Sequence, residues 1–302
     1  MKSRKAWKTR IAKEYGGTLF ILPWIIGFLG LTFVPFVCLL YFSVTKYDLL
    51  SAPRFIGMRN YVNIFTLDSK FLTSLLVTFK YAFIGVPLRL AVALLIAVVL
   101  NTRHHMIGFY RTLFYIPSII GGSVAVAVTW RTVFARDGAL NSLIWALTGV
   151  NPNFSWIADP KTALASLILL SIWQFGSPML IFLAGLKNIP VSYYEAAVVD
   201  GANSFHKFFR ITVPLLTPVI FFNLIMQLIN GFMTFTQGLI ITNGGPIDKT
   251  LFYQLYVYRL GFQQFNMGYA SALSCILLVI VAFFTALVFK SSSTWVYYES
   301  KD

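Results

Sequence analysis

Residues 267–289 read MGYASALSCILLVIVAFFTALVF, a run of 23 residues without a charged side chain. A transmembrane helix requires about 20 predominantly apolar residues, so this run predicts a helix that spans a membrane. Similarly apolar runs lie at residues 18–42, 72–100, 113–134, 163–186 and 217–241. The sequence therefore predicts an all-α, polytopic membrane protein with six transmembrane helices.

The composition excludes the alternatives to a membrane protein. Hydrophobic residues make up 58% of the 302 residues and charged residues only 11%, whereas soluble domains carry about 25% charged residues. The 29 Phe, 15 Tyr and 7 Trp exclude a disordered chain. The two cysteines, Cys38 and Cys275, lie inside apolar runs and indicate neither a disulfide framework nor a metal site.

The basic residues predict the orientation of the chain. The net charge is +14, and the Lys and Arg residues lie mostly between apolar runs and at the N-terminus, which favours anionic lipid headgroups over nucleic acid as their partner. Six of them precede the first run: Lys2, Arg4, Lys5, Lys8, Arg10 and Lys13. The positive-inside rule places this N-terminus, residues 1–17, in the cytoplasm. A transmembrane domain at 18–290 then returns the tail, residues 291–302, to the cytoplasm.

The positions of the acidic residues bear on how transport could be driven. All ten carboxylates lie outside the six apolar runs, and ion-coupled carriers commonly place ionisable groups inside the membrane. A proton-driven carrier is therefore disfavoured, although carbonyl oxygens alone can hold sodium. No serine-hydrolase, zinc-protease or phosphate-loop motif is present. We expect a non-catalytic chain without catalytic residues or a metal site.

The segment between the fourth and fifth runs, residues 188–218, reads NIPVSYYEAAVVDGANSFHKFFRITVPLLTP. Ser192 and Glu195 form a capping-box pattern for a short helix that ends at Val199. Gly201 supplies a left-handed residue after it. A second short helix follows, capped by Asn203 or Ser204, and Pro214 and Pro218 are expected to redirect the chain before span five.

Two interpretations of this helix pair remain open from spacing alone. Its exposed aromatic residues, Phe205, Phe208 and Phe209, are typical of a surface that docks into a partner. The alternative is an amphipathic elbow that rests on lipid headgroups, with Glu195 serving only as a helix cap.

The same segment resembles a known family. Glu195-Ala196-Ala197, followed by Gly201, Ile211 and Pro214, resembles the EAA loop of binding-protein-dependent ABC importer permeases; Val213 stands where that pattern has leucine. Pro23 and Pro35 in the first span, residues 55–61 and residues 242–246 are similar to sugar permeases of the maltose and glycerol-3-phosphate type.

The resemblance implies a fold and a set of partners. The fold is that of a type I ABC importer, whose EAA helix pair is a coupling element that fits a cytoplasmic ATPase. Carried over by position, the coupling residues are Glu195, Ala196, Ala197 and Gly201, while Asp200 is either a rim charge or a solvated loop charge. The implied partners are a second homologous permease, two ATPase subunits that bind ATP and magnesium, and an extracellular solute-binding protein. The implied location is the bacterial cytoplasmic membrane.

Polar residues in the fifth run predict a substrate path. They recur at spacings of 4, 3, 4 and 3, which places them on one face of a helix: Asn223, Gln227, Asn230, Thr234 and Gln237. Amides in hydrocarbon must find partners or face water, so the stripe either lines a sugar path or holds helices together. We favour the path, and the resemblance adds weight to Asn230, Thr234 and Gln237.

Two further pairs are candidate contacts for substrate. In span four, Trp173 and Gln174 are weaker candidates: an aromatic face could stack on a sugar ring, although most intramembrane tryptophans pack or anchor at the interface. In span two, Lys80 lies near enough to the outer end to reach the headgroups, whereas Arg89 lies deeper. Arg89 can face inner headgroups, which we rank first, a partner subunit, or an anionic substrate.

The leading hypothesis is therefore a translocation subunit of an ABC importer that moves a sugar, with an oligosaccharide favoured. The alternatives are a self-contained secondary carrier or channel for a polar solute, and a membrane-anchored enzyme or scaffold.

Overall fold

A computed structural model describes residues 20–102 and 105–297 of the chain. The predicted basic N-terminus at 1–17 and the last five residues of the predicted tail lie outside the described residues. Within the described part, contacts divide the chain into two compact units. Unit 1 comprises the chain up to Leu67 together with 259–277, and unit 2 comprises 68–258 together with the chain from Leu278 onwards.

The described residues contain four continuous helices long and apolar enough to cross a membrane: Phe20–Ser43, Ser69–Val99, Ser204–Phe232 and Met267–Trp295. Two bent pairs account for the remaining predicted spans. Helix α6 (Ile107–Ile120) meets α7 (Val124–Val133) at 95°, and α9 (Ala163–Trp173) meets α10 (Gly176–Asn188) at 41°. Each of the six apolar runs is thus mainly helical within the described residues, but the third and fourth bend at a break and the fifth is interrupted after Phe232.

Three of the spans contain the same local device. A π-helical turn, η1 (Leu29–Phe33), η2 (Tyr81–Gly85) or η3 (Phe208–Thr212), ends directly before a Val-Pro pair that begins α2 (Val34–Ser43), α5 (Val86–Val99) or α13 (Val213–Phe232). Proline has no N–H to donate to the carbonyl one turn back, and the wider turn lets the helix continue past it. The expected redirection at Pro214 and Pro218 is therefore wrong, because the helix that begins at Ser204 runs through both.

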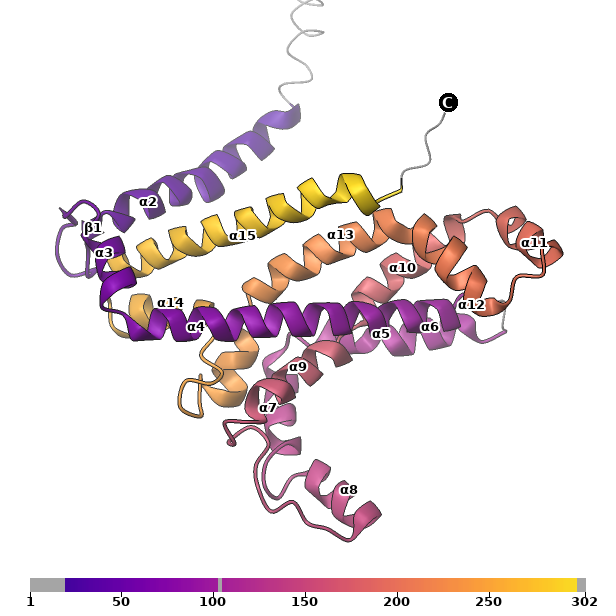
Figure 1. The fold of residues 1–302 in the computed structure, drawn as a ribbon. Helices are drawn as coiled ribbons and strands as arrows, with labels where there is room; N and C mark the ends of the chain where they lie inside the picture. The colour runs from indigo at the N-terminus through magenta and orange to yellow at the C-terminus, as the bar shows by residue number, and fades with distance from the viewer. Residues whose placement is uncertain (1–19, 103–104, 298–302) are drawn as a thin grey trace, which may run out of the picture. The chain divides into compact units, whose positions relative to one another are not determined.

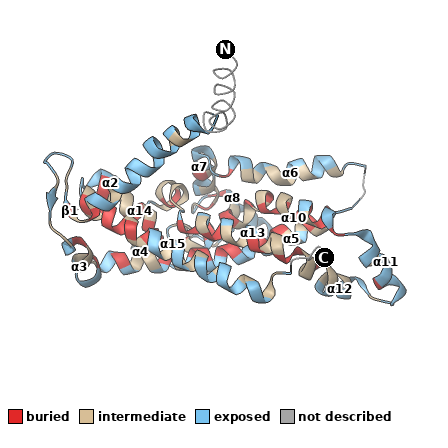
Figure 2. Cartoon of the chain, turned by 90° about the horizontal axis from the view of Figure 1, so that it is seen from above, coloured by how far each residue is buried: buried red, intermediate tan, exposed pale blue. Residues whose placement is uncertain are grey.

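Unit 1 contains a small antiparallel hairpin. Strand β1 (Thr45–Lys46) pairs with β2 (Arg54–Phe55), with Thr45 opposite Phe55, and α3 (Arg59–Thr66) follows. The buried amide Nδ2 of Asn60 donates to the carbonyl oxygens of Ser43 and Thr45, at 2.9 Å each. This amide fixes the hairpin to the end of α2, whose residues are coloured mostly as exposed in Figure 2.

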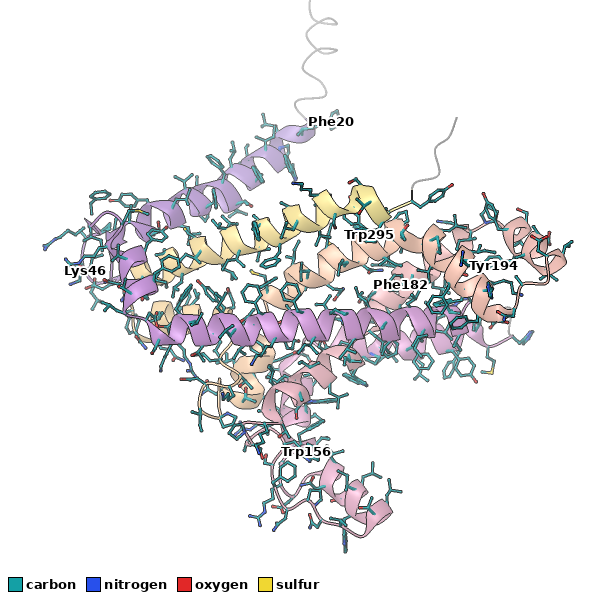
Figure 3. All side chains as sticks on the ribbon, viewed as in Figure 1. Phe20, Lys46, Trp156, Phe182, Tyr194 and Trp295 are labelled. Atoms are coloured by element: carbon teal, nitrogen blue, oxygen red, sulfur yellow. The ribbon has the colours of Figure 1, made fainter. Side chains whose placement is uncertain are left out.

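Unit 2 has its hydrophobic core between α5, α10 and α13, which pack together in Figure 1. Along α5 the buried residues recur at helical spacing: Val86, Leu90, Ala93, Ala97 and Leu100. They meet Phe182 and its neighbours on α10, and Figure 3 labels Phe182 within this bundle. The core thus holds α5, which contributes Val86 and Arg89 to the cavity described below.

The remaining elements of unit 2 connect these helices. They are α4 (Ser69–Lys80), α8 (Ala139–Thr148), α11 (Val191–Val199), α12 (Ser204–Lys207), η4 (Gly238–Thr242) and α14 (Tyr253–Tyr258). Two elements include residues of unit 1: η5 (Arg259–Gln263) lies within it, and α15 (Met267–Trp295) belongs to it up to Leu277. Beside α8, the indole of Trp156, labelled in Figure 3, donates to Asn141 Oδ1 at 2.6 Å.

Candidate functional site

The helix pair predicted between spans four and five is present, with a different beginning. Helix α11 starts at Val191 after Pro190, and no side chain caps its first turn. The predicted capping box of Ser192 and Glu195 is wrong, because the extended backbone at Pro190 begins the helix earlier and places Ser192 inside it.

The end of α11 follows the prediction. Gly201 has a φ of +75°, its N–H donates to the carbonyl of Val198, and the N–H of Ala202 donates to the carbonyl of Ala197. These two bonds form a Schellman motif, which only a residue that tolerates the left-handed region accommodates without strain. Asn203 then caps the next helix, since its Oδ1 accepts from the N–H of His206 at 2.8 Å.

A hydroxyl pair fastens α11 to the start of span five. The Tyr194 hydroxyl lies 3.0 Å from Oγ1 of Thr212, which is the last residue of η3. Tyr194 also packs against the core of unit 2, and it is labelled in Figure 3. The pair therefore joins α11 to a helix that runs on to Phe232.

The outer face of this helix pair is both apolar and exposed. We call it the elbow surface and define it by Val198, Val199, Phe205 and Phe209, all at least half exposed. The rings of Phe205 and Phe209 lie 4.5 Å apart. Of the predicted coupling residues, Ala197 is buried, whereas four are exposed: Glu195, Ala196, Asp200 and Gly201. Figure 2 shows α11 as mostly exposed.

A polar cavity of about 210 Å³ lies inside unit 2. Six of the residues singled out from the sequence line it: Arg89, Gln174, Gln227, Asn230, Thr234 and Gln237. Tyr81 and Ser171 line it as well, and the sequence interpretation missed both. Typical ligand sites measure about 300–1,000 Å³, so this cavity is the size of part of such a site.

Three side chains form a hydrogen-bonded chain along the wall of the cavity. The Tyr81 hydroxyl donates to Gln237 Oε1 at 3.1 Å, and Gln237 Nε2 donates to Gln174 Oε1 at 3.4 Å. Gln174 Nε2 donates in turn to the carbonyl of Gly121 at 2.8 Å. The amides are thus held in fixed orientations. Gln227 Oε1 is buried without a hydrogen-bond partner among the described residues.

The polar stripe does not continue along one helix as predicted. Helix α13 ends at Phe232, so Thr234 and Gln237 follow an interruption of the helix. They still face the same cavity as Gln227 and Asn230 because the chain resumes a helical turn, η4, after the break. The single-face prediction is wrong in its geometry, although these four side chains are brought together.

Three predicted contacts lie away from the cavity lining. Asn223 is fully buried, and its Nδ2 lies 3.5 Å from the carbonyl of Pro178. The ring of Trp173 lies 5.7 Å from that of Trp130, which is the packing role weighed for it from the sequence. Lys80 is exposed. None of the three is among the residues that line the cavity.

Arg89 points inward, contrary to the headgroup contact that we ranked first. Its Nε donates to the carbonyl of Gln174 at 2.9 Å and its Nη2 donates to the same oxygen at 2.5 Å. That carbonyl belongs to the residue directly after α9, and the Ser118 hydroxyl also donates to it at 2.8 Å. Arg89 thus stabilises the bend between α9 and α10 while lining the cavity.

Comparison with known proteins places this arrangement in a family. Residues 66–292 match the model described as "Binding-protein-dependent transport system inner membrane component". The chain belongs to this family. It is accordingly a multi-pass membrane protein and a translocation component rather than the subunit that hydrolyses ATP. Across residues 20–102 and 105–297, no group of three His, Cys, Asp or Glu residues could hold a metal ion.

The chain is similar to ABC transporter permeases over its full length. It is 55% identical to the probable ABC transporter permease protein YesP of Bacillus subtilis, over 100% of this chain and 96% of the relative. It is 32% identical to the trehalose/maltose transport system permease protein MalF of Thermococcus litoralis, over 91% and 92%.

A solved structure shares the fold. It is a bacterial alginate ABC transporter in complex with an alginate pentasaccharide-bound periplasmic protein, with a TM-score of 0.80 and 21% identity over 94% of this chain and 96% of that chain. The prediction of a type I importer-like, all-α fold is confirmed.

Proposed function

We propose that the chain is the permease subunit of an ATP-driven importer that translocates an oligosaccharide. The observation that carries the proposal is the cavity wall of amides and hydroxyls in Tyr81, Gln174, Asn230 and Gln237. Such groups both donate and accept hydrogen bonds, as the hydroxyls of a sugar do. The names of relatives such as the trehalose/maltose permease support the same class of substrate.

The size of the cavity supports a second permease subunit. One chain encloses about 210 Å³, and a homologous partner across the pathway would supply the opposite wall. The first span, which has no buried residue in its most apolar 18-residue stretch, offers apolar surface to that partner and to the lipid bilayer.

The elbow surface supports a partner that supplies the energy. Val199 is 87% exposed and Phe205 69% exposed, and such apolar residues outside the core typically mark a docking surface. We place a cytoplasmic ATPase here, one of two in the complex, with ATP and magnesium bound on those subunits. The elbow and both chain termini then lie in the cytoplasm, and an extracellular binding protein delivers the sugar from the other side.

Transport by the assembled complex tests this function. The chain is reconstituted in proteoliposomes with a second permease, the ATPase subunits and the binding protein, and accumulation of labelled oligosaccharides is measured with and without ATP. We expect accumulation that requires ATP and the binding protein. Accumulation by this chain alone, driven by an ion gradient, would instead support the carrier alternative.

A further inference from the structure

Among the described residues that line the cavity of unit 2, Arg89 carries the only charged side chain. It lies in α5, ten residues before the last residue of that helix, which places it about 15 Å from the helix end at 1.5 Å per residue. It is directed at the Gln174 carbonyl rather than at a headgroup. A positive charge is thus held within the membrane-spanning part of the chain, beside a polar cavity.

The described residues give Arg89 no negative partner. Both of its hydrogen bonds end on one neutral carbonyl oxygen, and no Asp or Glu is among the residues that line the cavity. A guanidinium has five N–H donors, so three remain after these two bonds. An uncompensated charge in such a place is costly and marks a functional site by default.

The rest of the cavity indicates what brings the missing negative charge. Its other polar groups are amides and hydroxyls, which suit sugar hydroxyls, and Gln227 Oε1 is a buried acceptor still without a described partner. A planar guanidinium pairs well with a carboxylate, which it can bind through two parallel hydrogen bonds. A phosphate carries more charge than one arginine neutralises, so a single Arg89 favours the carboxylate.

We infer that Arg89 binds a carboxylate of the transported sugar, so that the substrate is an acidic oligosaccharide containing a uronate. The inference rests on the proposed function and adds the class of saccharide. The hydrogen bonds from Arg89 to the Gln174 carbonyl fix the guanidinium at the bend between α9 and α10. The remaining N–H donors of Arg89 bind the substrate.

Two chemically matched libraries test the inference in the complete reconstituted transporter. One contains di- to tetrasaccharides with uronate residues, and the other is the same library after its carboxylates have been reduced to primary alcohols. Mass spectrometry reports which sugars accumulate with ATP. We expect the uronate forms to accumulate at least about tenfold more than the reduced forms, because a charge-assisted pair is lost on reduction.

Variants locate that preference in this chain, since the binding protein is unchanged. Arg89→Gln is expected to reduce uronate accumulation about tenfold to a hundredfold more than it reduces accumulation of the reduced sugars. Arg89→Lys, which keeps the charge but not the planar fork, is expected to keep the preference at lower accumulation. If Arg89→Gln does not assemble, the ratio of uronate to reduced-sugar accumulation in Arg89→Lys is compared with the wild-type ratio instead. Ser118→Ala removes the other donor to the Gln174 carbonyl and is expected to keep the wild-type preference.

The outcomes separate this inference from the proposed function. ATP-dependent accumulation of the reduced library at the same level overturns the inference and leaves the proposed function standing. Equal losses for both libraries in the Arg89 variants, matched by Ser118→Ala, assign Arg89 to the bend alone and also overturn it. A preference for sugar phosphates over uronates overturns the carboxylate assignment, and no accumulation of any saccharide contradicts both proposals.

Discussion

The Tyr194 hydroxyl and Oγ1 of Thr212 lie 3.0 Å apart and join the exposed helix α11 to the first turns of span five. Thr212 ends the π-helical turn η3, from which α13 continues to Phe232. Part of the cavity lining, including Gln227, Asn230 and Gln237, lies on and just beyond the far end of α13. This hydrogen bond therefore joins α11, which carries Val198 and Val199 of the elbow surface, to the continuous helix Ser204–Phe232 that leads to the cavity.

Removal of this hydroxyl should weaken the coupling of hydrolysis to transport. For Tyr194→Phe we expect less sugar transported per ATP hydrolysed, because a hydrogen bond worth about 1 kcal/mol is lost. The ratio of uptake to phosphate release in proteoliposomes measures this. Thr212→Val should have a similar effect, and the double variant should be little worse than either single variant. Fully additive losses would show that the two residues act separately.

Gly201 should be required for coupling beyond its effect on stability. At a φ of +75°, an alanine costs about 1–2 kcal/mol, and we expect Gly201→Ala to lower ATP hydrolysis stimulated by the binding protein. Gly149 is a matched control, because its φ is +69° and it likewise has open space around the position of a Cβ atom. Gly149→Ala should cost similar thermal stability and leave the stimulation intact. Equal losses of stimulation in both variants would assign the effect to destabilisation.

The cavity geometry distinguishes two asparagines that the sequence places on one stripe. Asn230 lines the cavity, whereas Asn223 is fully buried outside its lining. We expect Asn230→Ala to reduce oligosaccharide uptake about tenfold, since loss of a hydrogen bond to substrate leaves a polar group unpaired. Asn223→Leu should keep uptake within about twofold, because it also removes a buried oxygen that has no hydrogen-bond partner in the described part of the chain. A larger loss at Asn223 than at Asn230 would place the substrate path elsewhere.

Gly121 should be intolerant of any side chain. A Cβ atom there would lie 2.4 Å from the carbonyl oxygen of Pro117 and 2.5 Å from Cγ of Gln174. Gly121→Ala is therefore expected to displace Gln174 and to destabilise the protein by about 1–3 kcal/mol, measured as a lower Tm of the complex in detergent. Gly122→Ala is the control, since it meets nothing within 4 Å. Equal Tm values for the two variants would mean that α6 and Gln174 adjust freely.

The fold class and the extent of most spans could be predicted because apolar length alone requires helices in a membrane. The bends could not. The break at 121–123 separates helices that meet at 95°. Hydropathy reports how apolar a segment is, but it carries no information on the angle between consecutive helices. A signal was present in Gly121-Gly122-Ser123, because the Ser123 side chain accepts from the N–H of Val126 at the start of α7.

The candidate site was predictable in part for the same reason. Polar residues in apolar runs stand out, and Gln174, Gln227 and Asn230 do line one cavity. Tyr81 and Ser171 were missed because tyrosine and serine are common in membrane helices and their partners come from distant segments. The inward direction of Arg89 depends on the Gln174 carbonyl, a contact between residues 85 positions apart that no local pattern encodes.

Solute accumulation with the energy source varied tests the proposed role most directly. The chain is reconstituted in proteoliposomes either alone or with a second permease, the ATPase subunits and the binding protein. Each preparation is given either ATP, on the side of the membrane where the ATPase subunits lie, or a proton or sodium gradient. The predicted result is accumulation only in the complete complex and only with ATP. Accumulation by the single chain under an ion gradient would contradict it.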